Sequence, residues 1–168
     1  MADFIPAFQK MIRREGGYVL HTIAGDRGGQ TYAGIARNSW PQWEAWRAID
    51  DGETPPAEVV RAFYQAQFWF AIHGDKITDQ TIAETIFDFA VNGGVKTAAI
   101  LAQTIVGVTP DGKIGPKTLA ALNAQNPEKF VMAYALAKIA RYAAIVRRDR
   151  SQQKFLLGWV TRALEGVA

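Results

Sequence analysis

Cysteine is missing from this chain of 168 residues, and histidine occurs only twice, as His21 and His73. The absence of thiols excludes a disulfide scaffold, a thiolate nucleophile and a cysteine-ligated metal site. Two histidines cannot build a multi-histidine centre, so we predict no metal site. Long apolar runs are missing too, because none reaches the roughly 18–20 residues that span a bilayer. We therefore predict no stable membrane insertion.

The N-terminus lacks a basic segment followed by an apolar core, and residues 1–6 contain no Lys or Arg. No secretory signal peptide is visible, so we expect synthesis in the cytoplasm. Strong charge is lacking as well: 19 Lys and Arg against 16 Asp and Glu give a net charge of +3. This slight basic excess favours, weakly, an anionic partner such as nucleic acid, a membrane surface or a bacterial wall.

The composition that remains is that of a folded protein, with 49% apolar and 21% charged residues. It excludes disorder as the main state, and the length suits one domain or two small ones that share a core. Apolar residues recur at helical spacing along most of the chain, so we predict a mainly α fold. The predicted helices lie near residues 4–15, 39–50, 54–73, 82–92, 95–105, 116–122, 127–149 and 152–164.

Glycine marks two breaks in the helical pattern. Residues 17–34 contain five glycines, which predicts a loop with a short hairpin or irregular β segment. Asn92-Gly93-Gly94 predicts a helix end and a domain boundary. We therefore predict two domains, residues 1–92 and 93–168, with the helical C-terminal part packed on the N-terminal part.

Glu15 is an unusual residue for the predicted C-terminal end of the first helix. The helix dipole presents partial negative charge there, so Lys or Arg would be the stabilising choice. Gly16 and Gly17 follow and let a ligand approach the backbone. A carboxyl group that is disfavoured in its ionised form suits general-acid catalysis. Glu15 is therefore a candidate catalytic acid, and an exposed helix end is the structural alternative.

Asp26 lies in the polar, glycine-rich segment and should remain ionised. Two carboxylates in different environments are the minimum equipment for cleaving a glycosidic bond. Thr31 adds a hydroxyl that could orient a water or a substrate group. The alternative is that Asp26 only forms a turn with the glycines that follow it. On residue types alone, the structural interpretation of these residues is favoured.

The order of these residues resembles a known signature. Glu15-Gly16-Gly17-Tyr18, followed by the Asp26 segment Asp-x-Gly-Gly-x-Thr-x-x-Gly-Ile, is similar to glycoside hydrolase family 108. That family consists of peptidoglycan-cleaving lysozymes of phages, prophages and some bacterial secretion systems. The resemblance implies a lysozyme-like helical catalytic part with Glu15 as its acid. The order Glu, Asp, Thr also resembles phage lysozymes, which implies catalytic roles for Asp26 and Thr31.

One segment departs from the family and another continues the resemblance. The family usually has an Asn-Asp-Pro-like stretch where this chain has residues 20–23, so Asp26 remains the acidic candidate in the loop. Residues 87–94 resemble the family's Asp-x-Ala-Val-Asn-x-Gly segment. Asp88 and Asn92 are four residues apart and share a helix face. They could point toward a sugar and serve as substrate-binding residues, or they could close the helix locally.

Residues 107–122 resemble the Asp-Gly-x-x-Gly-x-x-Thr core of peptidoglycan-binding modules, which extends the resemblance over nearly the whole chain. Asp111-Gly112 predicts a tight turn and Ile114 an apolar anchor. Gly115 is expected to allow a special backbone angle before the helix that Pro116 begins. These residues build a shape and need not contact the wall.

Aromatic and amide side chains near the proposed carboxylates supply candidates for sugar binding. Tyr18 and Tyr32 flank the carboxylates and could stack on a sugar, and Gln30 lies in the same stretch. Tryptophans at positions 40, 43 and 46 would form a stripe on one helix face, either as core or as a sugar platform. Residues 68–70 are consecutive aromatics, so at least one of them should face solvent.

The resemblance implies an N-acetylmuramidase that hydrolyses the β-1,4 bond between N-acetylmuramic acid and N-acetylglucosamine, without metal or organic cofactor. Bacterial peptidoglycan would be its partner, and a holin or another export system could release it to act on the wall in the periplasm. A non-catalytic peptidoglycan-binding protein with the same fold is the alternative. A nucleic-acid-binding helical protein would show steeply salt-dependent binding. No recognition-helix motif supports it, so we predict no nucleic-acid partner.

Overall fold

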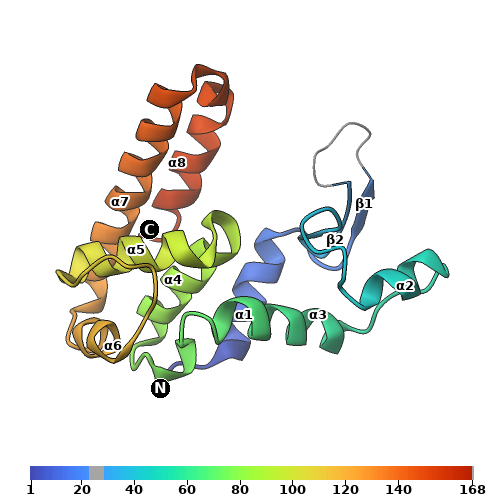
Figure 1. Cartoon of the computed structure of the whole chain (residues 1–168), viewed down its shortest axis with the longest axis horizontal. Helices are drawn as coiled ribbons and strands as arrows, with labels where there is room; N and C mark the ends of the chain where they lie inside the picture. The colour runs from blue at the N-terminus through green and yellow to red at the C-terminus, as the bar shows by residue number, and fades with distance from the viewer. Residues whose placement is uncertain (23–28, 168) are drawn as a thin grey trace. The chain divides into compact units, whose positions relative to one another are not determined.

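The computed structural model describes residues 1–22 and 29–167. The described residues are mainly helical with one small sheet, which confirms the predicted fold class. The chain divides into two compact units. We call Phe4–Gln67 the N-terminal unit, and Met1–Asp3 together with Phe68–Ala168 the C-terminal unit. Figure 1 shows the elements of each unit.

Helix α1 (Phe4–Arg14) opens the N-terminal unit and buries one apolar face. Its buried side chains recur at the three- and four-residue spacing of an amphipathic helix. They are Phe4, Ala7, Phe8, Met11 and Ile12. Phe8 also packs on Tyr64 at the end of helix α3 (Ala57–Tyr64), with ring centroids 5.9 Å apart. This contact fixes the end of α3 against the helix that leads to Glu15.

A small antiparallel sheet follows α1 and confirms the predicted hairpin. In spatial order its strands are β1 (Leu20–Thr22), β2 (Gln30–Tyr32) and β3 (Ile35–Ala36). The register places His21 opposite Thr31. Ala33 and Gly34 connect β2 to β3 with φ values of 51° and 80°, as a two-residue type I′ turn requires. Ala33 is strained there, because a residue with a Cβ rarely adopts positive φ.

Helix α2 (Ala45–Asp50) is shorter than the helix predicted over 39–50, and that prediction was wrong in its first half. Pro41 explains the difference, because proline lacks an N–H and disfavours helical backbone in the residue before it. The predicted tryptophan stripe on one helix therefore does not form, since Trp46 alone of the three lies in α2.

Helix α3 continues directly into a π-helical turn, Gln65–Trp69. A π turn adds one residue to a helical turn and shifts the direction of the side chains that follow. Of the three consecutive aromatics, Phe68 and Trp69 are buried, whereas Phe70 is 50% exposed. The expectation that one of them faces solvent is therefore confirmed.

The C-terminal unit contains a helical core. Its elements are η2 (Gly74–Lys76), α4 (Gln80–Gly93), α5 (Val95–Val106), α6 (Pro116–Asn123), α7 (Pro127–Arg148), η3 (Arg150–Phe155) and α8 (Leu156–Leu164). Helix α4 packs against α5 and α7, and α7 runs beside α8 (Figure 1). Phe89 of α4 meets the rings of Tyr134 and Tyr142 of α7, at 5.9 and 6.4 Å between centroids. The boundary predicted at 92/93 falls inside this unit, and as a limit between independent domains it stays a prediction.

A buried glutamine organises the loop between α5 and α6. Gln103 is 1% exposed. Its Nε2 donates to Asp111 Oδ1 at 2.8 Å, to the Lys113 carbonyl at 3.0 Å and to Thr118 Oγ1 at 3.2 Å. Its Oε1 accepts from the Gly112 N–H at 2.9 Å. One side chain thus satisfies polar groups on both sides of the turn, as a buried amide should.

The special backbone angle of this loop lies at Gly112 rather than at Gly115. Gly112 has φ 80°, whereas Gly115 has φ −102°, which any residue can adopt. The prediction for Gly115 was therefore wrong. A Cβ on Gly112 would also lie 2.7 Å from Lys96 Cγ, so both backbone and space require glycine. Ile114 is buried, as predicted for an anchor.

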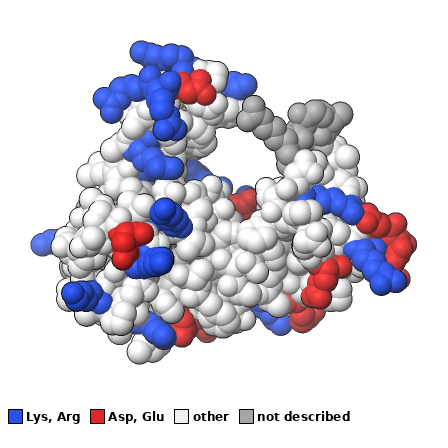
Figure 2. Space-filling model, in the orientation of Figure 1, with Lys and Arg blue, Asp and Glu red and all other residues white. Residues whose placement is uncertain are grey.

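Exposed basic side chains gather where α7 ends and η3 begins, on the face shown in Figure 2. We call this patch the basic tip; it consists of Arg147, Arg148, Arg150 and Lys154. Asp149 lies within it and accepts a hydrogen bond from the Ser151 N–H, which caps η3. Among the described helices, none combines the length and the apolarity needed to cross a membrane.

Candidate active site

The end of α1 fixes the position of Glu15. The Gly16 N–H donates to the Arg13 carbonyl at 3.3 Å, and the Gly17 N–H donates to the Ile12 carbonyl at 2.9 Å. This pair of bonds forms a Schellman motif with Glu15 as the C-cap. Gly16 and Gly17 have φ values of 85° and 78°, which glycine adopts without strain. Among the described residues, no atom lies within 4 Å of the position that a Cβ would take on either glycine.

Glu15 lies against the turn between β2 and β3. A Cβ on Gly34 would be 3.1 Å from both Cβ and Cγ of Glu15, and 2.7 Å from the Tyr64 hydroxyl. The missing side chain of Gly34 therefore allows Glu15 and Tyr64 to approach the same point of the backbone. The Tyr64 hydroxyl donates to the Ala33 carbonyl at 2.8 Å. Burial, and then the charge of Glu15, raise the pKa of Tyr64, so this hydroxyl remains a donor at neutral pH.

Thr31 lies in the middle of β2, between His21 of β1 and Ala36 of β3. It is half-buried and belongs to the hairpin whose turn Glu15 contacts. The predicted second carboxylate, Asp26, lies outside the described residues. The structure thus brings Glu15 and Thr31 to one hairpin of the N-terminal unit.

The two predicted tyrosines have different environments. Tyr18 is 41% exposed directly after the glycine pair, so its ring is open to a ligand. Tyr32 is 3% exposed; its ring stacks beside Trp43 at 6.3 Å and its hydroxyl donates to the Pro55 carbonyl at 3.5 Å. Because side chains alternate along a strand, Tyr32 points into the core of the unit. We therefore correct the prediction that its ring offers a platform to a sugar.

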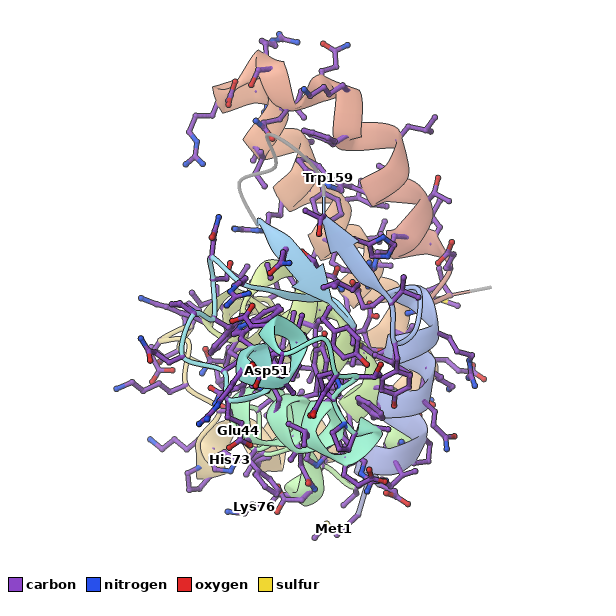
Figure 3. The ribbon with its side chains drawn as sticks, turned by 90° about the vertical axis from the view of Figure 1, so that its right-hand side faces the viewer. Met1, Glu44, Asp51, His73, Lys76 and Trp159 are labelled. Atoms are coloured by element: carbon purple, nitrogen blue, oxygen red, sulfur yellow. The ribbon has the colours of Figure 1, made fainter. Side chains whose placement is uncertain are left out.

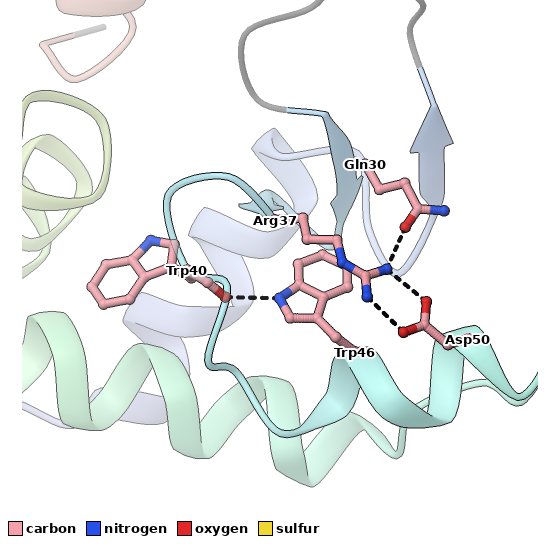
Figure 4. A network of polar contacts seen from close by, with 5 residues as sticks. All are labelled: Gln30, Arg37, Trp40, Trp46 and Asp50. Atoms are coloured by element: carbon pink, nitrogen blue, oxygen red, sulfur yellow. Dashed lines mark hydrogen bonds and ion pairs between the residues drawn. The ribbon is translucent and has the colours of Figure 1, made fainter.

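Gln30 takes part in a polar network that joins the sheet to α2, drawn in Figure 4. Arg37 donates to both carboxylate oxygens of Asp50 and to Gln30 Oε1, each at 2.6 Å. The Arg37 guanidinium also lies over the ring of Trp46, 5.2 Å from its centroid. The hydrogen bond from Arg37 lowers the pKa of Asp50 below its usual value. In this arrangement Gln30 braces the sheet, and its role in substrate binding stays a prediction.

Asp88 and Asn92 lie on α4 and belong to the C-terminal unit. Asp88 Oδ1 forms a partly buried ion pair with Arg162 of α8 at 3.3 Å. Asn92 Nδ2 donates back to the Asp88 carbonyl at 2.7 Å. The Asn92 bond is local, as the structural alternative for the segment expected, whereas Asp88 pairs with a residue 74 positions later in the chain. The substrate-binding role of both residues stays a prediction. Within residues 1–22 and 29–167, no group of three or more His, Asp or Glu side chains could hold a metal ion.

Tyr64 is the residue of this site that sequence reasoning missed. Its spacing on α3 is that of a core residue, and it is in fact 1% exposed. No local pattern shows that its hydroxyl reaches a turn 31 residues earlier in the chain. The available signal was Gly34, because a glycine after Ala33 indicated a tight turn that another group could approach closely.

Comparison with known proteins assigns the chain to a family. The family described as Glycosyl hydrolase 108 matches residues 8–94, and the one described as Predicted Peptidoglycan domain matches residues 97–164. The first match covers more than half of the chain, which belongs to the glycosyl hydrolase 108 family. The protein is thus a glycoside hydrolase that acts on the peptidoglycan of the cell wall.

The fold has a solved counterpart. The structure of Brucella abortus SagA aligns with a TM-score of 0.74 and 24% sequence identity, covering 98% of this chain and 91% of that one. This likeness concerns the fold. No curated protein matched the chain.

Proposed function

We propose that the protein is a lysozyme that hydrolyses the β-1,4 bond between N-acetylmuramic acid and N-acetylglucosamine, with Glu15 as general acid. The observation that carries the proposal is the placement of Glu15. It caps α1 directly before two glycines and packs against Gly34, in a family that cleaves glycosidic bonds. A general acid must hold its proton near the leaving oxygen, and a fixed helix end provides that position.

In this proposal Glu15 donates its proton to the glycosidic oxygen as the bond breaks. Tyr64 positions the site from behind, because its hydroxyl holds the Ala33 carbonyl and thereby fixes the turn that Glu15 contacts. Asp26 would stabilise the oxocarbenium-like transition state or help Thr31 to position the attacking water. Tyr18 would support the sugar through its exposed ring.

Replacement of Glu15 by Gln tests the proposal. The substitution keeps the size and the hydrogen-bonding capacity of the side chain but removes the proton donor. We expect lysis of purified peptidoglycan to fall about 10²- to 10⁴-fold while thermal stability is kept. Mass spectrometry of the fragments released by the wild type should show N-acetylmuramic acid at the new reducing ends. Wild-type lysis by Glu15→Gln would favour another acid, and no lysis by the wild type would favour the non-catalytic wall-binding alternative.

The proposal also includes export of the enzyme to the periplasm and electrostatic binding to the cell wall. A holin or another export system would bring the enzyme to the periplasm. The basic tip would then add an electrostatic contact with the wall, which carries carboxylates on its peptides. Binding of the Glu15→Gln protein to insoluble peptidoglycan should therefore weaken as salt is raised, because exposed charges are screened.

A further inference from the structure

A cavity of about 560 Å³ opens on the N-terminal unit, between α3 and the segment that precedes α2. The lining residues on which the argument depends include Trp40, Trp43, Glu44, Ala62 and Phe63. The volume falls within the roughly 300–1,000 Å³ of small-molecule sites. Glu15 and Thr31 do not line it. The cavity is thus separate from these two described residues of the proposed site, although all belong to one unit.

The floor of the cavity is an aromatic cluster with fixed geometry. The Trp40 ring meets Phe63 edge to face, with centroids 4.9 Å apart and an interplanar angle of 89°. Trp43 lies 5.7 Å from Phe63 and 5.2 Å from Trp46. The Trp46 Nε1–H donates to the Trp40 carbonyl at 2.8 Å, which anchors the segment to α2. Trp40 and Trp43 line the cavity and are half-buried, so these contacts hold two partly accessible indole rings at its wall.

The rim of the cavity is polar and mostly neutral. Ser39, Gln42 and Gln67 offer a hydroxyl and two amides, and all three are exposed. The charged residue among the lining residues is Glu44, which Figure 3 labels at the start of α2. Aromatic faces with neutral donors and acceptors suit a sugar, which has apolar C–H faces and a ring of hydroxyl groups. The carboxylate of Glu44 disfavours an anionic ligand.

Consecutive residues of α3 connect this cavity to the proposed active site. Phe63 lines the cavity, whereas Tyr64 holds the turn beside Glu15, and the two rings meet edge to face at 5.4 Å. A glycan strand is a polymer, so an enzyme that cuts it encounters several sugars at once. A second sugar-binding surface on the same rigid helix would hold the strand away from the scissile bond.

We propose that the cavity lined by Trp40, Trp43 and Phe63 binds a neutral N-acetylglucosamine unit of the glycan strand and discriminates against N-acetylmuramic acid. The inference rests on the proposed function, which makes the glycan strand the substrate. The two sugars differ by the lactyl group of N-acetylmuramic acid, which carries a carboxylate or the anionic stem peptide. Glu44 repels that group and leaves N-acetylglucosamine as the favoured ligand.

The test measures binding apart from catalysis. The full-length Glu15→Gln protein is titrated with soluble N-acetylglucosamine oligomers, and tryptophan fluorescence is followed, because Trp40 and Trp43 line the cavity. Ala62→Phe fills the cavity from the exposed face of α3 without removing a core side chain. Ala57→Phe on the same helix is the matched control, since Ala57 is exposed and does not line the cavity. We expect Ala62→Phe to weaken binding about tenfold or more, and Ala57→Phe to leave the affinity unchanged.

Charge selectivity provides the second arm. Glu44→Gln should leave the affinity for neutral oligomers unchanged and tighten binding of muramic-acid-containing fragments by about two- to fivefold, as expected for an exposed charge pair. Equal affinity of Ala62→Phe and wild type, or no effect of Glu44→Gln on anionic fragments, would overturn the proposal. These readouts do not depend on Glu15 chemistry. If Glu15→Gln remains lytic, the proposed acid is wrong while binding at the cavity is still measured.

Discussion

Each unit contains a tight turn with positive φ, at Gly112 in the C-terminal unit and at Ala33 and Gly34 in the N-terminal unit, and the two turns have different surroundings. In the C-terminal unit, the turn at Gly112 is held by Gln103, which satisfies polar groups on both sides of it. In the N-terminal unit, the turn at Ala33 and Gly34 includes a strained alanine and is crowded by Glu15 and Tyr64. The hydrogen bonds of the first turn stabilise the loop between α5 and α6. The second turn contains a strained residue, Ala33, next to the proposed acid Glu15, and backbone strain of this kind is often found at functional sites.

Among the substitutions that test this comparison, Gly34→Ala should have the largest effect on stability and lysis. The alanine would have to adopt a positive φ of about 80°. Its Cβ would lie 2.7 Å from the Tyr64 hydroxyl and 3.1 Å from Cβ and Cγ of Glu15. We expect unfolding free energy to fall by about 2–4 kcal/mol and lysis to be nearly lost, because Glu15 must move. Chemical denaturation and turbidity assays measure the two effects.

Gly52→Ala is the matched control, because Gly52 has φ 79° but, among the described residues, no atom lies within 4 Å of its Cβ position. It should cost about 1 kcal/mol from backbone strain and leave lysis intact. If the two variants behave alike, the crowding at Gly34 has no role in positioning Glu15.

Gln103→Ala should destabilise the C-terminal unit, because it leaves the buried Thr118 hydroxyl and two part-buried backbone groups of the loop without this partner. We expect a loss of about 2–4 kcal/mol in unfolding free energy, measured by denaturant titration. The specific activity of the fraction that remains folded, on short soluble glycans, should stay near wild type. A loss of turnover in the folded protein would mean that the loop also acts in catalysis.

Tyr64→Phe should have a smaller effect on stability and a visible one on catalysis. It removes the hydroxyl that donates to the Ala33 carbonyl, at a cost of about 1 kcal/mol. If Tyr64 positions Glu15 through the turn, kcat should fall severalfold while KM stays constant. A purely structural role predicts the same change in stability with unchanged kcat and an unchanged pH profile of lysis.

The smallest effect is expected from the pH dependence of the network around Arg37. The pKa of Asp50 is lowered by Arg37, so the pair stabilises the folded state above the ordinary Asp pKa of about 4. That contribution is lost as the pH falls through the lowered value. Asp50→Asn should therefore reduce the loss of thermal stability between about pH 5 and pH 2. An unchanged slope in this range would show that the pair contributes nothing measurable.

Local patterns allowed most helices to be predicted, because burial of one face repeats every three or four residues along the chain. The amphipathic face of α1 and the glycine ends of α1 and α4 were predicted for this reason. The helix over 39–50 was wrong because Pro41 and the Trp46 hydrogen bond to the Trp40 carbonyl override the spacing of the tryptophans.

The site was less predictable, since its geometry depends on contacts between distant segments. Glu15 could be selected from its motif, whereas the contact of Tyr64 with the hairpin turn could not. Tyr32 illustrates the opposite error: its position beside the motif indicated a ligand contact, but strand alternation turns its ring into the core. The cavity beside Trp40 also escaped prediction, because it depends on the break in the helix at Pro41.

The packing of α4 on α5 and α7 has a consequence for recombination between members of this family. Exchange of modules between such enzymes by homology would place the junction near residue 94, where the two family matches meet. A junction there separates Phe89 from Tyr134 and Asp88 from Arg162. Each parent must then supply a surface that fits the foreign helix, so hybrids should survive mainly between parents that share these contacts. Transfer of residues 68–168 as one cassette keeps them together.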